Sequence, residues 1–118
     1  MIQLLPSRTP ELTAAAVAYM QNQLGMPSRL TQLWGPSCRV QTDFDGQPIQ
    51  QYLTVLVRMS GGQYLLVRQI IDLERISRRS PTILELPERE AHWWINNLEL
   101  ELVRDEEAIQ DPVASAIT

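Results

Sequence analysis

The feature that most constrains this fold is a segment over residues 51–71, in which two apolar arms flank a glycine turn. The arms cover residues 52–59 and 63–71, and the turn between them is Ser60-Gly61-Gly62. This arrangement is typical of a β-hairpin. A strand with one face in water alternates apolar and polar residues, and these arms alternate only in part. We therefore expect the second face of the hairpin to need a cover, from the same chain or from a partner.

The length of the turn decides which residues share a face of the hairpin. A three-residue loop pairs Val57 with Leu65, whereas a two-residue loop would place Arg68 among the valines. Burying an unpaired arginine is costly, so we predict the three-residue loop, with a glycine in the left-handed conformation. The odd face is then the core face, with Leu53, Val55, Val57, Met59, Leu65, Val67 and Ile71. The even face is amphipathic, with Tyr52, Thr54, Leu56, Arg58, Tyr64, Leu66, Arg68 and Ile70.

A helix precedes the hairpin. Thr9-Pro10-Glu11 is a helix-start signal and Gly25 is a stop signal, with apolar residues at helical spacing between them. These signals predict a helix over residues 10–24. The following segment, 26–34, is ambiguous, and a short helical turn that Gly35-Pro36 ends is one interpretation.

Two successive hairpins predict an antiparallel meander. Residues 38–44 alternate as a strand, and the Asp45-Gly46 pair after them is a strong hairpin signal. We expect the second and third strands over residues 49–59 and 63–73. Residues 82–86 fit a short fourth strand.

A second helix is expected after Pro87, with acidic residues in its first turn. Two interpretations compete for its end. The apolar spacing fits a helix to about residue 103, but residues 98–102 also alternate as a strand, which would end the helix at Asn96-Asn97. We prefer the longer helix.

The elements together predict an α+β fold. It is an antiparallel meander sheet of three to four strands, flanked by an N-terminal and a C-terminal helix in the order α-β-β-β-β-α. Residues 1–104 are expected to form a single domain, and residues 105–118 an acidic, disordered tail.

Composition excludes several classes of function. The chain has 118 residues, a net charge of −4, one cysteine and no lysine. Without lysine, Schiff-base chemistry and a phosphate-binding loop of the P-loop type are excluded. One cysteine forms no internal disulfide, no signal peptide is evident, and no apolar run approaches the ~20 residues of a membrane helix. We expect a cytoplasmic protein that does not enter a membrane.

Residues suited to chemistry are few. His92 is the only histidine, and Glu88 precedes it by one helical turn, which predicts a surface contact. Nothing in the sequence activates Cys38 as a nucleophile with His92 as its base. A metal site needs more histidine, cysteine or clustered carboxylate ligands than the chain offers. We therefore expect no catalytic residue, no metal and no cofactor, and a protein that is not an enzyme.

The apolar content of the even hairpin face predicts an interaction surface. Trp93 adds to it, because Trp94 belongs to the apolar stripe of the second helix and Trp93 points the opposite way. Exposed tryptophan is enriched at interface hot spots. We predict a non-catalytic protein–protein interaction module, an accessory, adaptor or assembly factor, that binds a partner protein or forms a homodimer. The expected contact residues are Tyr52, Leu56, Arg58, Tyr64, Leu66, Arg68 and Trp93.

A nucleic-acid-binding regulator is the alternative hypothesis. It would use the basic cluster Arg75, Arg78 and Arg79 together with the arginines and tyrosines of the even face. The negative net charge and the lack of a wider basic field make it the second choice.

Overall fold

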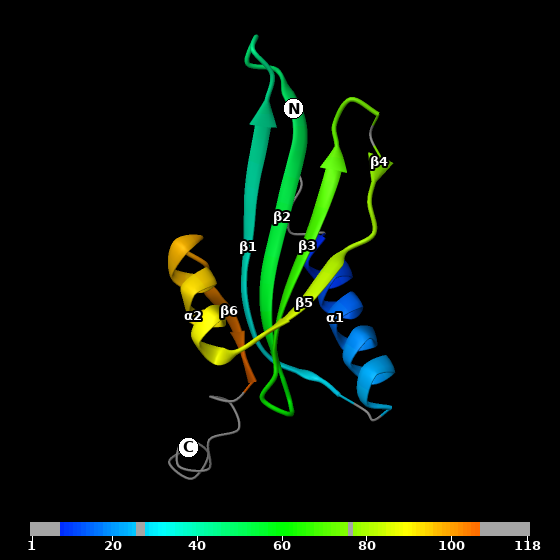
Figure 1. Cartoon of the computed structure of the whole chain (residues 1–118), viewed down its shortest axis with the longest axis vertical. Helices are drawn as coiled ribbons and strands as arrows, with labels where there is room; N and C mark the ends of the chain where they lie inside the picture. The colour runs from blue at the N-terminus through cyan, green and yellow to red at the C-terminus, as the bar shows by residue number, and fades with distance from the viewer. Residues whose placement is uncertain (1–7, 26–27, 76, 107–118) are drawn as a thin grey trace, which may run out of the picture.

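The computed structural model describes residues 8–25, 28–75 and 77–106. These residues form an antiparallel β-sheet with one helix on each face (Figure 1). The elements are α1 (Arg8–Leu24), β1 (Leu30–Thr42), β2 (Pro48–Met59), β3 (Tyr64–Asp72), β4 (Ser77–Arg78), β5 (Thr82–Leu86), α2 (Glu88–Asn97) and β6 (Leu102–Asp105). The predicted α+β class is confirmed.

The sheet extends the predicted meander at both edges. Its strand order is β4-β3-β2-β1-β6, and β5 also pairs with β3. Along β3, residues 64–68 pair with β5, whereas Ile71 and Asp72 pair with β4. On the opposite edge, β6 pairs with residues 32–34 of β1. Neither β4 nor β6 was expected from the sequence.

The central hairpin has the predicted register. Val57 pairs with Leu65 and Val55 with Val67, so the loop is the three-residue one. Gly62 in this loop has φ 89°, a conformation that only glycine adopts without strain. The odd residues therefore lie on one sheet face, which we call the α1 face, and the even residues lie on the other, the α2 face.

Helix α1 covers the α1 face. It contributes Leu12, Ala16 and Met20, which are four residues apart and so lie along one side of the helix. They pack on the odd residues of the hairpin and on β1, in a cluster that contains Leu30, Leu33, Leu53, Val55, Val57, Met59, Leu65 and Val67. The core predicted for the odd face is confirmed.

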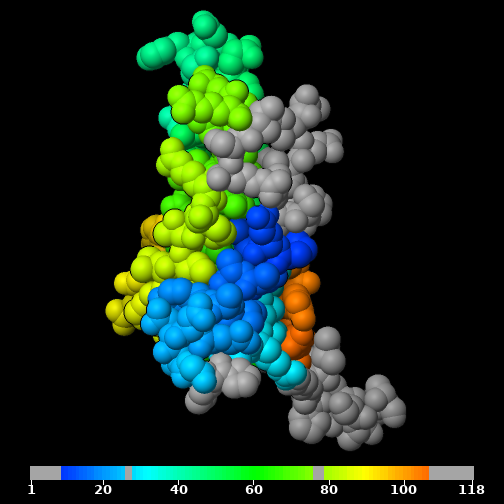
Figure 2. Space-filling model, turned by 90° about the vertical axis from the view of Figure 1, so that its right-hand side faces the viewer, coloured from blue at the N-terminus to red at the C-terminus, as the bar shows by residue number. Residues whose placement is uncertain are grey.

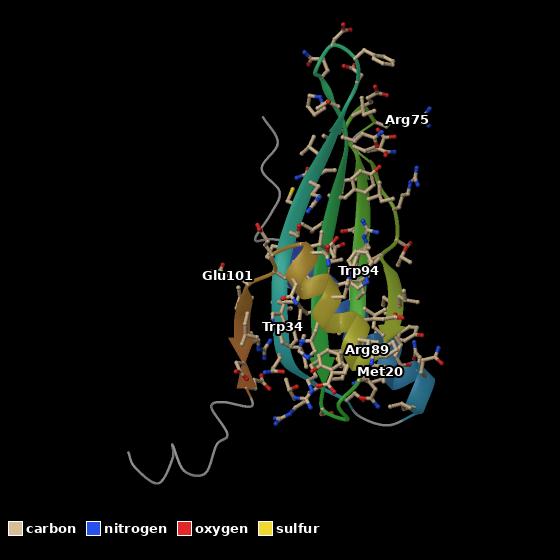
Figure 3. All side chains as sticks on the ribbon, turned by 60° about the vertical axis from the view of Figure 1, so that its left-hand side comes forward. Met20, Trp34, Arg75, Arg89, Trp94 and Glu101 are labelled. Atoms are coloured by element: carbon tan, nitrogen blue, oxygen red, sulfur yellow. The ribbon has the colours of Figure 1, made fainter. Side chains whose placement is uncertain are left out.

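Helix α2 covers the lower half of the α2 face (Figures 1 and 3). It contributes Ala91, with Trp94 and Ile95 partly buried beside it. The sheet and the chain after α2 contribute Trp34, Leu56, Tyr64, Leu66, Leu86 and Leu100. The second apolar face of the hairpin is thus covered by the same chain over this half of the sheet.

The helical turn considered for residues 26–34 is not formed in the described part of that segment, because β1 begins at Leu30. The pairing of β1 with β2 is irregular between Leu30 and Gln32 and again between Trp34 and Ser37. Each irregularity puts residues three positions apart on the same face: Leu30 and Leu33 both pack in the α1-face cluster, and Trp34 and Ser37 both pair with even residues of β2. A strand with a bulge lacks the period-two pattern by which strands are recognised.

The long form of the second helix is also wrong. Helix α2 ends at Asn97, as in the competing interpretation, and the strand that follows begins only at Leu102. Between them, Glu99 takes a positive φ of 52°. The backbone N–H of Leu100 donates to the carbonyl of Ile95, and this turns the chain back toward β1. Asp105, assigned to the tail by the sequence, lies in β6, and residues 107–118 lie outside the described residues.

Candidate protein-interaction surface

Three of the predicted contact residues lie under α2. Leu56, Leu66 and Tyr64 are 0%, 3% and 6% exposed. The Tyr64 ring lies between Trp34, with ring centroids 6.1 Å apart, and His92, with centroids 6.0 Å apart. The expectation that these three side chains are exposed is wrong, because the second helix packs on them. They stabilise the fold and are not open to a partner.

The two arginines of this face lie on opposite sides of α2. In the sheet register, Arg58 pairs with Tyr64 and Arg68 with Thr54, and the Leu56–Leu66 pair under the helix lies between them. The half-buried Arg58 has its guanidinium 5.7 Å from the centroid of the Tyr64 ring. The exposed Arg68 has its guanidinium 5.7 Å from the centroid of Trp94. Both distances fit cation–π contacts.

The remaining arginines of the nucleic-acid hypothesis do not join this pair. Arg75 lies near the upper end of the sheet, away from α2 (Figure 3). Arg79 is exposed beside β3, where its backbone N–H donates to the carbonyl of Ile70. The side chain of Arg78 is outside the described structure. The described arginines therefore form no single basic face.

Trp93 projects from the outer side of α2. It is 55% exposed, whereas its neighbour Trp94 is half-buried toward the sheet. The two indoles meet edge to face, with centroids 5.2 Å apart and an interplanar angle of 87°. Arg68 lies over Trp94, so the three side chains form a continuous stack from the sheet to the outer side of the helix. We call Arg68, Trp94 and Trp93 the aromatic stack.

The upper half of the α2 face is more polar. Tyr52 is half-buried there, and its hydroxyl lies 2.7 Å from the side-chain oxygens of both Gln41 and Gln50, to one of which it can donate. A hollow of ≈ 170 Å³ lies beside it, lined by Tyr52, Arg68, Gln69, Ile70 and Thr82. Tyr52 and Arg68 thus line the same hollow, and Arg58 does not line it.

The potentially reactive side chains are separated by the sheet. His92 Nε2 lies 3.7 Å from Glu88 Oε1 on the exposed surface of α2, which confirms the predicted contact. Cys38 pairs with Leu53 of the α1 face and accepts from the side-chain amide of Gln51. Within the described ranges, no three histidine, cysteine, aspartate or glutamate side chains cluster closely enough to hold a metal ion.

The tip of the β1–β2 hairpin is an exposed apolar feature that was not predicted from the sequence. This hairpin projects beyond both helices and forms the top of the molecule in Figure 2. Phe44 at its tip is fully exposed, and Val40 on β1 is 50% exposed. Asp43 Oδ1 stabilises the turn by accepting from the backbone N–H groups of Asp45 and Gln47, each at 2.9 Å. The only signal was an aromatic residue at the end of the predicted strand, directly before the Asp45-Gly46 turn.

Comparisons of the chain with protein-family models, curated proteins and solved structures found no match. Neither α1 nor α2 is long and apolar enough to cross a lipid bilayer.

Proposed function

We propose that the chain is a non-catalytic, cytoplasmic protein-interaction module, an accessory or assembly factor, that binds a partner protein through the outer side of α2. Trp93 is its anchor. The observation that carries this proposal is an indole that is 55% exposed and yet held in place by an edge-to-face contact with Trp94.

The aromatic stack makes Trp93 a suitable anchor because it already restricts the conformations of the Trp93 side chain, so binding would remove less conformational entropy. Trp94 packs on the α2-face cluster and contacts the guanidinium of Arg68, and Trp93 rests on Trp94. Ordering a rotamer-rich side chain at an interface costs about 0.5–1.5 kcal/mol, and much of this cost is already met in the free protein. Tryptophan is also among the residues most enriched at binding hot spots.

The surroundings of Trp93 match the organisation of a small interface. Residues three and four positions away on a helix are surface neighbours. For Trp93 these are Arg89, Glu90, Asn96 and Asn97, all exposed and polar. A polar rim around an apolar centre excludes water from the central contact. The partner chemistry that fits is an apolar pocket that accepts one indole, bordered by groups able to bind both charges.

Affinity capture with the full chain as bait tests this proposal. Trp93→Ala is the test variant, and Phe44→Ala is the matched control, because Phe44 is also an exposed aromatic residue but lies on the hairpin tip. We expect a partner that the wild type and Phe44→Ala retain, and that Trp93→Ala binds more weakly by about 30-fold, corresponding to a hot-spot loss of about 2 kcal/mol.

Circular dichroism of Trp93→Ala should match the wild type, because the indole is outside the core. A bait that retains no protein would refute the proposal, as would a partner that binds Trp93→Ala and the wild type equally well.

A further inference from the structure

Among the described residues, the outer edge of β1 has a neighbouring strand only along its lower part. In the described part of the chain, β6 pairs with β1 only at residues 32–34. Above this point β1 forms the edge of the sheet, where Cys38 to Thr42 are all exposed (Figure 1). Alternate residues of such an edge present backbone N–H and C=O groups that can pair with another strand.

This free edge has defined ends. At the lower end, the backbone N–H of Gly35 donates to the carbonyl of Glu101, which closes the edge beside β6, and Pro36 has no N–H to offer. At the upper end, Asp43 bonds to Gln47 within the hairpin turn. The available edge therefore runs over residues 37–42 of β1, with Asp43 beside it at the start of the turn, and Val40 lies at the centre of residues 37–43.

We propose that this edge pairs antiparallel with the same edge of a second copy of the chain, about a two-fold axis at Val40. The two sheets then form one continuous sheet. A two-fold contact uses the same patch on both copies, so the patch must be self-complementary. Placing the axis at Val40 uses the whole edge, because Ser37 then pairs with Asp43 of the second copy, and Cys38 with Thr42 of the second copy.

The side chains of the edge are complementary in this register. Val40, which is 50% exposed on the α1 face, meets Val40 of the second copy and buries apolar surface. On the α2 face, Arg39 lies opposite Gln41 of the second copy, and its two diagonal neighbours are Asp43 and Arg39 of the second copy; the long arginine side chain can turn toward Asp43 and away from the other arginine. Long side chains reach such diagonal neighbours, and opposite charges there are favourable.

Other registers are worse. A shift by one residue would place side chains of opposite faces beside each other. A shift by two residues in one direction would set Arg39 against Arg39 of the second copy, and like charges directly opposite are destabilising. A shift by two in the other direction would set Arg39 opposite Asp43 of the second copy, but it would leave Ser37 and Cys38 unpaired and remove the contact between the two Val40 side chains. Both helices lie below this part of β1 (Figure 1).

Cysteine crosslinking of the full chain tests both the dimer and its register. In a Cys38→Ser background, Val40→Cys should give a disulfide-linked dimer under mild oxidation. Directly opposite residues have Cα atoms about 4.5–5.5 Å apart, within the range of a disulfide. The matched control is Thr42→Cys in the same background. Its two cysteines would lie four residues apart along the strands, roughly 14 Å, and should not crosslink. With native Cys38 present, Thr42→Cys should crosslink.

Sedimentation equilibrium provides the second measurement. We expect the wild type to dimerise and Val40→Glu, which sets two like charges at the axis, to raise the dissociation constant at least tenfold with unchanged circular dichroism. Trp93→Ala should dimerise as the wild type does, so the outcome of this test is independent of whether the outer side of α2 binds a partner. A wild type that stays monomeric, a dimer indifferent to Val40→Glu, or equal crosslinking by the control would each overturn the proposal.

Discussion

Leu56→Ala tests whether the second face of the hairpin is part of the core. Leu56 is fully buried on β2, between β1 and β3 within the sheet and below α2. If the face were open to solvent in the free chain, truncating this leucine would change stability by no more than about 0.5 kcal/mol. If α2 covers it, the truncation leaves a cavity.

The structure gives the expected size of the effect. Leucine-to-alanine changes at buried sites cost about 2–5 kcal/mol, and the larger values apply where the surroundings cannot collapse. Leu56 is held by paired strands on both sides, so its site collapses poorly, and we expect about 3–4 kcal/mol. A domain is usually stable by about 5–15 kcal/mol, so this variant should still fold.

Urea denaturation followed by tryptophan fluorescence is the appropriate assay, because Trp34 and Trp94 report from the same cluster as Leu56. With a slope of about 2 kcal/mol per molar, the midpoint should fall by about 1.5–2 M. The matched control is Leu84→Ala. Leu84 pairs with Leu66 on the same sheet face but is 54% exposed, and its truncation should leave the midpoint nearly unchanged.

A Leu56→Ala variant as stable as Leu84→Ala, with an unchanged slope, would refute the packing of α2 on the sheet. The hairpin face would then be open again to a partner. A large loss for both variants would instead show that the cover extends over β5.

Two further predictions concern the backbone of the β1–β2 hairpin. Gly35→Ala should lower the free energy of unfolding by about 1–3 kcal/mol in the same urea assay. Gly35 has φ 108°, and a Cβ there would lie 3.0 Å from the carbonyl oxygen of Thr54. An unchanged midpoint would contradict this geometry. Asp43→Ala removes two exposed hydrogen bonds, so amide hydrogen exchange at Asp45 and Gln47 should speed up by roughly tenfold. The global free energy of unfolding should fall by no more than about 1 kcal/mol. Unaltered exchange at both amides would contradict the turn geometry.

The local parts of the fold could be predicted because their signals lie within a few residues. The loop of the central hairpin followed from the cost of placing Arg68 among valines, and its pairing of Val55 with Val67 is observed. The strand over residues 82–86 was predicted with the observed bounds, and α1 was predicted to within two residues at its start. In each case the turn or capping residues and the spacing of the apolar residues indicate the same helix or strand.

The failure at β6 is long-range in origin. The pairing of β6 with β1 joins segments about 70 residues apart, and no local pattern announces it. The same pairing makes Leu102 part of a strand, although its spacing from Leu98 also fits a helix. The first half of β1 was missed for a different, local reason, because the irregular pairing at Gly35-Pro36 breaks the alternation of the strand.

For the interaction surface as well, the sequence predicted the local pattern but not the long-range packing. The sequence correctly indicated that the even face of the hairpin requires a cover, and the structure shows that α2 supplies it over Leu56, Tyr64 and Leu66. Patterning can identify an apolar face but not what packs on it, because helix docking depends on the whole chain. Trp93 was separated from Trp94 by helical spacing alone, and that distinction agrees with their observed exposure.

The position of β6 has a consequence for the order in which the protein can be completed during synthesis. The lower edge of β1, residues 32–34, stays without its neighbour until Leu102 to Asp105 have been made. At ribosomal rates of about 5–20 residues per second, the interval after β1 is complete is roughly 3–12 s. Throughout this time a nascent chain carries an open strand edge beside Leu33 and Trp34. Strand β6 therefore covers this edge only when synthesis has passed Asp105. A chain truncated after α2 would keep the edge open and be the form most prone to aggregate there.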